Sequence, residues 1–179
     1  MNFSPVPTRE DVSPDNQAIF DNLKKMLTFV PNLYATFAHS ATALGTYLSL
    51  QNAKSSLNAK QREVINLVVS QVNECEYCLA AHTAVGKMVG FSDANILEIR
   101  SGRATFDPKL DALARYVREV TEKRGHVAAA STQAFLENGW TKGNLVDIMI
   151  VIGDKIISNY LHSVTNVEID FPAAPKLAA

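Results

Sequence analysis

Helix-start signals recur along this chain, and the apolar residues that follow each of them are spaced as in an amphipathic helix. A clear example is Asn58 with Gln61 three residues later, which predicts a capping box. No stretch alternates apolar and polar residues between turn pairs, so no strand is predicted. The pattern indicates an all-α protein. The predicted helices cover residues 15–30, 33–53, 59–71, 74–89, 93–100, 108–125, 128–138 and 142–161.

The length and composition fit one domain. The chain has 179 residues, of which 47% are hydrophobic, and this is enough to bury a full core without disulfides or a metal. No internal repeat or shift in composition marks a boundary. We therefore expect a single helical domain over residues 1–179, with an extended proline-containing arm at 1–13 and a frayed tail at 172–179.

The charge and the N-terminal sequence exclude several classes of partner. There are 17 basic and 18 acidic residues, with a net charge of -1, so no basic surface for nucleic acid or an anionic membrane is expected. The first residues lack the pattern of a signal peptide, and no apolar run approaches the ~20 residues that span a bilayer. We expect a cytoplasmic protein with no nucleic-acid or membrane partner.

Both cysteines and one histidine lie in a single short stretch. In a helix, with about 100° per residue, Cys75, Cys78 and His82 share an arc of about 60°. In a reducing compartment such a pair favours redox chemistry or metal binding over a structural disulfide. Asn73 and Glu76 predict a second capping box, which would place Cys75 in the first helical turn, where the helix dipole favours a thiolate.

This spacing of thiols and imidazole suits the cleavage of a peroxide bond. Cys75 and Cys78 are close enough in a helix to form a disulfide, and His82, four residues after Cys78, can take a thiol proton. A thiolate that attacks a peroxide becomes a sulfenic acid, which a second thiol converts to a disulfide. A non-catalytic module stabilised by a metal is an alternative, although the chain has no second cysteine pair of the kind found in most structural zinc sites.

The motif resembles a known family, the carboxymuconolactone decarboxylase superfamily, and in particular its alkylhydroperoxidase D-like, peroxidase-related branch. The resemblance is firmest over residues 57–100 and implies a compact multi-helix domain of the alkylhydroperoxidase D-like type. The residues that carry it are Arg62-Glu63, Val69-Ser70, Cys75-Glu76-Tyr77-Cys78 and Ala81-His82.

The resemblance also implies roles for individual residues. Cys78 is the peroxidatic thiol and Cys75 the resolving thiol, and Glu63 and His82 pass a proton to and from Cys78. Well-studied members have a histidine just before the second cysteine, where this chain has Tyr77. Since a phenol does not titrate near neutral pH, Tyr77 is expected at the site with an effect on the rate and not on the class of reaction.

The activity that the resemblance implies is reduction of alkyl hydroperoxides by an external thiol or lipoyl-type reductant. The chain has no flavin or nicotinamide fingerprint, so we expect no cofactor, and the reducing equivalents must come from a separate protein or a small thiol. Lactone decarboxylation, after which the superfamily is named, is the enzymatic alternative, but it does not use the CxxC. The resemblance further implies a homo-oligomer, trimer or hexamer, with the arm and the last helix as candidate interfaces.

Overall fold

The computed structural model describes residues 5–177, which form helices and connecting segments with no strand. The expected all-α fold is confirmed. Within the described residues, no helix is both long enough and apolar enough to cross a membrane. The elements are the 3-10 helix η1 (Arg9–Asp11) and the α-helices α1 (Pro14–Leu27), α2 (Asn32–Phe37), α3 (Ala43–Gln51), α4 (Ala59–Val72), α5 (Glu76–Met88), α6 (Asp93–Arg100), α7 (Pro108–Glu122), α8 (Ala129–Glu137) and α9 (Lys142–Thr165).

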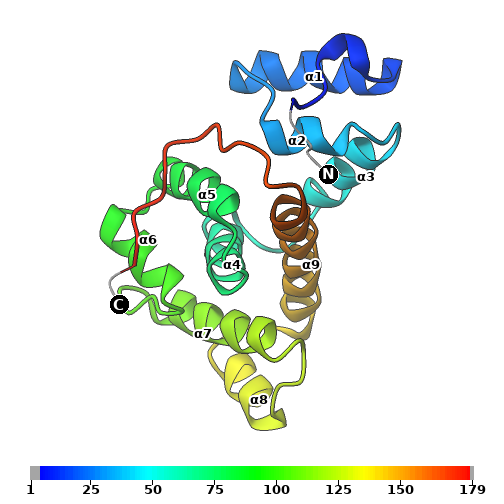
Figure 1. Cartoon of the computed structure of the whole chain (residues 1–179). Helices are drawn as coiled ribbons and strands as arrows, with labels where there is room; N and C mark the ends of the chain where they lie inside the picture. The colour runs from blue at the N-terminus through cyan, green and yellow to red at the C-terminus, as the bar shows by residue number, and fades with distance from the viewer. Residues whose placement is uncertain (1–4, 178–179) are drawn as a thin grey trace.

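Helix α4 lies at the centre of the fold, with α5, α6, α7 and α9 packed around it (Figure 1). Its start has the predicted capping box, because Asn58 and Gln61 exchange hydrogen bonds between side chain and backbone. Every residue from Glu63 to Ser70 is buried. A helix that is covered on all sides can direct polar side chains only toward other helices.

The thiol stretch lies where two parts of the core meet. One hydrophobic cluster surrounds α4 and includes residues of α6, α7, α8 and α9. A second cluster joins α1, α2 and α3 to the start of α5 and contains both Cys75 and Cys78. Figure 1 shows α1–α3 at one end of the molecule and α8 at the other. The cysteines are therefore enclosed by α2 and α3 on one side and by the central helices on the other.

The single helix predicted over residues 33–53 is wrong, because the chain forms two helices, α2 and α3, with a turn between them. The side-chain amide of Asn16, on α1, donates to the carbonyl oxygens of Ala38 and Ser40. The Ser40 hydroxyl accepts a hydrogen bond from the amide of Ala43. These contacts replace the hydrogen bonds that would continue the helix, since short polar side chains compete for backbone groups.

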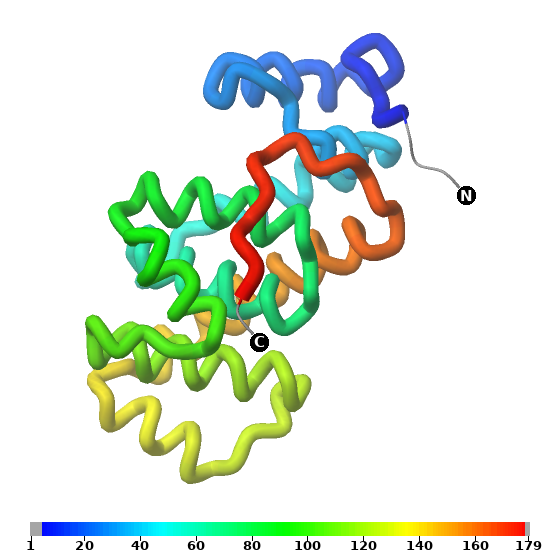
Figure 2. The backbone as a smooth tube through the Cα atoms, turned by 60° about the vertical axis from the view of Figure 1, so that its left-hand side comes forward, coloured from blue at the N-terminus to red at the C-terminus, as the bar shows by residue number. Residues whose placement is uncertain are grey.

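The segment after α9 follows a defined path and differs from the expected frayed tail. Asn166 ends α9 in a left-handed conformation, with φ of 48°. The chain then passes α5 and ends beside α6 (Figure 2), where the Pro175 carbonyl accepts a hydrogen bond from Arg100 Nη1 at 2.6 Å. In the arm, η1 is attached to α1 by a salt bridge between Arg9 and Asp21. Residues 1–4 of the expected arm and 178–179 of the expected tail lie outside the described residues.

The central position of α4 predicts a large cost for a cavity there. Leu67 is fully buried on α4, so Leu67→Ala should lower the free energy of unfolding by about 2–5 kcal/mol, as measured by urea denaturation. Met88, 84% exposed at the end of α5, provides the control, and Met88→Ala should change stability by about 0.5 kcal/mol or less. A loss below about 1 kcal/mol for Leu67→Ala would contradict this packing.

Candidate active site

Helix α5 begins directly after Cys75, and the Cys75 side chain caps it. Cys75 Sγ accepts a hydrogen bond from the amide of Cys78 at 3.4 Å. The capping box predicted for Asn73 and Glu76 is wrong, because Asn73 is the C-cap of the preceding helix, directly after Val72, and its side chain donates to Asn159 on α9. Only three residues separate α4 from α5, and Glu74 reverses the chain direction with φ of 54°. Cys75 thus lies at the N-cap and not within the first turn.

The two cysteines are free thiols with different acidities. Both are buried, and Cys78 Sγ lies 3.9 Å from Ser158 Oγ. A hydrogen bond from Cys75 lowers the pKa of Cys78 to about 6, with Lys155 and His82 acting in the same direction against the effect of burial. The same hydrogen bond, together with burial, raises the pKa of Cys75. Cys78 is therefore the thiol that ionises first, and the thiolate is the nucleophilic form.

A carboxylate of α4 contacts the imidazole of α5. His82 Nδ1 lies 2.8 Å from Glu63 Oε2, and Asn66 Nδ2 donates to Glu63 Oε1 at 2.7 Å. Burial by itself raises the pKa of Glu63, but His82 and Asn66 outweigh it and the net shift is downward. Glu63 is therefore ionised near neutral pH. The structure brings together the two side chains that the sequence pattern paired, although they come from different helices.

Lys155, on α9, also belongs to this group, and the sequence analysis did not identify it. Its Nζ lies 3.1 Å from His82 Nε2, 3.5 Å from Tyr47 OH and 3.7 Å from Asp154 Oδ2. Burial lowers the pKa of Lys155, but Tyr47, when it is ionised, and the charges of Asp154 and Cys78 raise it by more, so the side chain is a cation. One signal was present in the sequence: a charged pair interrupts the apolar run of the last helix, and buried charges need partners.

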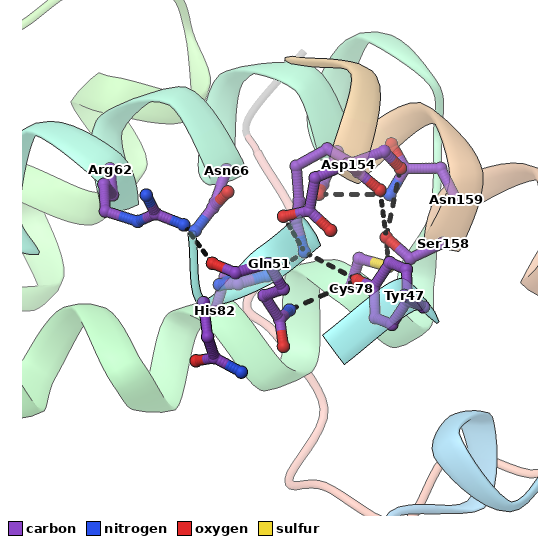
Figure 3. Close-up of polar contacts among 12 residues, drawn as sticks. Tyr47, Gln51, Arg62, Asn66, Cys78, His82, Asp154, Ser158 and Asn159 are labelled. Atoms are coloured by element: carbon purple, nitrogen blue, oxygen red, sulfur yellow. Dashed lines mark hydrogen bonds and ion pairs between the residues drawn. The ribbon is translucent and has the colours of Figure 1, made fainter. Parts of the chain in front are cut away.

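Polar contacts extend from this lysine into α2 and α3. The Gln51 side chain donates to Tyr47 OH at 3.2 Å and accepts from Tyr34 OH at 2.7 Å. Arg62 donates to the backbone carbonyl of Gln51 (Figure 3). Burial raises the pKa of both tyrosines, so each phenol is neutral near pH 7. The α2–α3 pair therefore contributes polar groups to the site as well as apolar cover.

Tyr77 makes its hydrogen bonds away from the Glu–His pair. Its hydroxyl donates to Asp170 Oδ1 at 2.6 Å and accepts from the amide of Leu33 at 3.2 Å. Asp170 also accepts from the amide of Asn32 at 2.7 Å, and the Tyr77 ring packs edge-on against Phe171. Burial is the main cause that raises the pKa of Tyr77. The phenol thus joins α5 to the start of α2 and to the segment after α9.

Neither nitrogen of the His82 imidazole is free to bind a metal. Its two nitrogens contact Glu63 and Lys155, respectively. Over residues 5–177, no group of three or more His, Cys, Asp and Glu side chains is arranged to hold a metal ion. The metal-stabilised alternative therefore has no donor set in the described part of the chain.

A known protein family matches part of this chain. The sequence profile of the carboxymuconolactone decarboxylase family matches residues 35–123, which include both cysteines, Glu63 and His82. The chain belongs to this family. The matched region ends before α9, so Lys155 lies outside it. No curated protein sequence matches the chain.

Solved structures share the fold over nearly the whole chain. An alkylhydroperoxidase AhpD core protein from Ralstonia eutropha JMP134, described as peroxidase-related, has a TM-score of 0.84 and 22% identity, over 93% of this chain and 90% of that chain. A peroxidase-related protein from Silicibacter sp. TM1040 has a TM-score of 0.82 and 22% identity, over 93% and 91%. The debrominase Bmp8 has a TM-score of 0.76 and 13% identity, over 93% and 92%. The fold is thus of the expected alkylhydroperoxidase D-like type.

The contacts of Tyr77 predict a structural effect when its hydroxyl is removed. Tyr77→Phe leaves Asp170 Oδ1 without its donor and the buried amide of Leu33 without its acceptor, so it should lower the free energy of unfolding by about 1–3 kcal/mol, measured by urea denaturation. The alkylation rate of Cys78 should stay at its wild-type value. Met88→Ala, at a residue that is 84% exposed, is the control and should change neither quantity. A fall of about tenfold or more in Cys78 alkylation by Tyr77→Phe would instead assign the phenol to the thiol chemistry.

Proposed function

We propose that this protein is a thiol-dependent peroxidase that reduces alkyl hydroperoxides. The observation that carries the proposal is the pair of free thiols of opposite pKa shift, with the acidic one beside the His82–Glu63 contact. An ionised nucleophile, a second thiol that stays protonated and a neighbouring polar group that can move protons are what peroxide reduction requires. Membership of the family and the shared fold support a peroxidase-related enzyme.

The reaction follows from the order in which the thiols ionise. The Cys78 thiolate attacks the terminal oxygen of the hydroperoxide: a sulfur–oxygen bond forms, the oxygen–oxygen bond breaks, and the alkoxide takes a proton that the His82–Glu63 pair relays from solvent, so that it leaves as alcohol. Cys78 is now a sulfenic acid. The Cys75 thiol attacks its sulfur, a disulfide forms, and the hydroxyl leaves with the Cys75 proton as water.

An external dithiol completes the cycle. It transfers two electrons and two protons to the disulfide, restoring both cysteines and becoming oxidised itself. The proton that was taken from solvent returns there when the restored Cys78 thiol ionises again. A lipoyl-type or other small thiol is the proposed donor. We propose that the protein acts in the cytoplasm, where thiol reductants can recycle the disulfide.

The same family includes decarboxylases, and decarboxylation of a lactone is the alternative activity. That reaction does not need two thiols of unequal acidity. The pKa shifts of Cys75 and Cys78 therefore favour the peroxidase.

The thiol cycle is tested by peroxide consumption. Purified protein should consume cumene hydroperoxide with dihydrolipoamide as reductant, and Cys78→Ser should abolish the reaction. Cys75→Ser should reduce one equivalent of peroxide and then stop, with a sulfenic acid on Cys78 that dimedone traps. Thiol titration should find both free thiols before peroxide and neither after one equivalent. Full turnover by Cys78→Ser would overturn the proposed mechanism.

We further propose that copies of the chain associate through the exposed side of α9. An apolar stripe follows this side at alternating intervals of four and three residues, the spacing with which two helices pack along a seam. Gly153 lies within the stripe, and a side chain added there would meet nothing within 4 Å. The stripe consists of Val146, Ile150, Gly153, Ile157, Tyr160 and Val164.

A charge in the middle of the stripe should separate the copies. Ile157→Asp is expected to lower the mass measured by analytical ultracentrifugation, since a carboxylate cannot be buried in an apolar seam without a partner. Met26→Asp introduces the same charge at a residue of α1 that is 71% exposed, and it should leave the mass unchanged. A wild-type protein that sediments as a monomer would contradict the interface.

A further inference from the structure

Lys155 is the most completely buried cation of the described chain. It is 2% exposed, on the side of α9 that faces α3, α4 and α5. A lysine without compensation would lose its proton in such a place. Here the compensation comes from polar atoms of three helices, and the same atoms belong to the proposed peroxidase site.

The contacts of the ammonium group determine how the imidazole is held. Glu63 is ionised, so it accepts a hydrogen bond from His82 Nδ1, which must carry a proton. Nε2 is then the unprotonated nitrogen, and it accepts from Lys155 Nζ at 3.1 Å. Lysine has only donors, so the tautomer with the proton on Nε2 would lose this contact. Lys155 and Glu63 together therefore allow only the tautomer of His82 that has its proton on Nδ1.

These contacts also prevent a direct hydrogen bond between His82 and Cys78. Neither nitrogen of His82 is left for a direct contact with Cys78, because one contacts Glu63 and the other contacts Lys155. Beside the hydrogen bond from Cys75, the positive charge that favours the Cys78 thiolate must therefore come from another group. Lys155 provides it, and its charge acts on Cys78 at a site where water does not screen it.

We propose that Lys155 is a positioning residue of the thiol site, which holds His82 as a hydrogen-bond acceptor at Nε2 and supplies the positive charge that favours the Cys78 thiolate. This role rests on the proposed function and deepens it. The motif within residues 57–100 is thus incomplete on its own, since its cation comes from the last helix.

The charges around Lys155 explain why it remains an ammonium. Asp154, its neighbour on α9, lies within 3.7 Å and has a second buried oxygen without a partner among the described residues. Loss of the Lys155 charge would leave this carboxylate uncompensated, which is costly. The groups that face Lys155 are Tyr34 of α2, Tyr47 of α3, Glu63 of α4, Cys78 and His82 of α5, and Asp154 of α9.

The test is the acidity of Cys78, measured without any peroxide. The rate of iodoacetamide alkylation at Cys78 is followed against pH by peptide mass spectrometry. In the wild type the rate should rise with pH through an inflection near 6 and level off above it, because the thiolate is the reacting form. In Lys155→Met the inflection should move up by about one unit, the effect expected from loss of a nearby opposite charge.

Lys87→Met is the matched control, because it removes a lysine from the surface of α5, where Lys87 pairs with Asp93. It should keep the wild-type inflection. If Lys155→Met fails to fold, Asp154→Asn combined with Lys155→Met removes the buried pair without leaving a lone charge, and its inflection should lie above that of Asp154→Asn alone. An inflection that does not move up when Lys155 is removed from a folded protein would overturn the proposal.

A second measurement uses the wild-type protein alone. Nitrogen-15 NMR of the histidine side chains at pH 8 should show His82 with its proton on Nδ1 and with Nε2 as an acceptor. A proton on Nε2 would overturn the positioning role. Both readouts are independent of turnover: a protein with these properties that does not consume hydroperoxide would refute the proposed function and leave the role of Lys155 intact.

Discussion

A carboxylate on the central helix is the constraint on which the arrangement of the site depends. Glu63 lies on α4, where the surrounding helices exclude water, so protein groups must provide the hydrogen bonds that water would otherwise donate to the carboxylate. His82 and Asn66 do this. The connection between α4 and α5 is only three residues long, and this limits how α5 can slide along α4. The hydrogen bond between His82 and Glu63 then selects one position within that narrow range.

The last helix closes the same polar group from the other side. Asp154 and Lys155 extend it from His82 to α9, and Tyr47 connects it to α3 (Figure 3). Removing one member of such a group leaves its neighbour buried without a partner, which lowers the free energy of unfolding by more than the lost contact itself. The group therefore acts as a unit. It fixes the relative positions of the helices, and it sets the electrostatic environment in which one of two adjacent thiols becomes acidic.

Most helices could be predicted from the sequence because their signals are local. The box of Asn58 and Gln61 is found where it was expected, since both partners lie within one turn. The turn that divides α2 from α3 could not be predicted, because it depends on Asn16, 22 and 24 residues before the carbonyls that it binds. Distance along the chain has the same effect at the site. Glu63 and His82 were identified by the family motif, whereas Lys155 is 73 residues from His82 and no spacing rule links them.

Oxidation of the two cysteines would change the capping of α5. A helix start is usually capped by an oxygen that plays no part in chemistry, but here the acceptor is the sulfur of Cys75. A bond from that sulfur to Cys78 would turn it toward its new partner and withdraw it from the amide that it caps. The first turn of α5 would then be looser in the oxidised protein than in the reduced one. Hydrogen exchange at the amide of Cys78 would therefore be faster in the oxidised protein than in the reduced one.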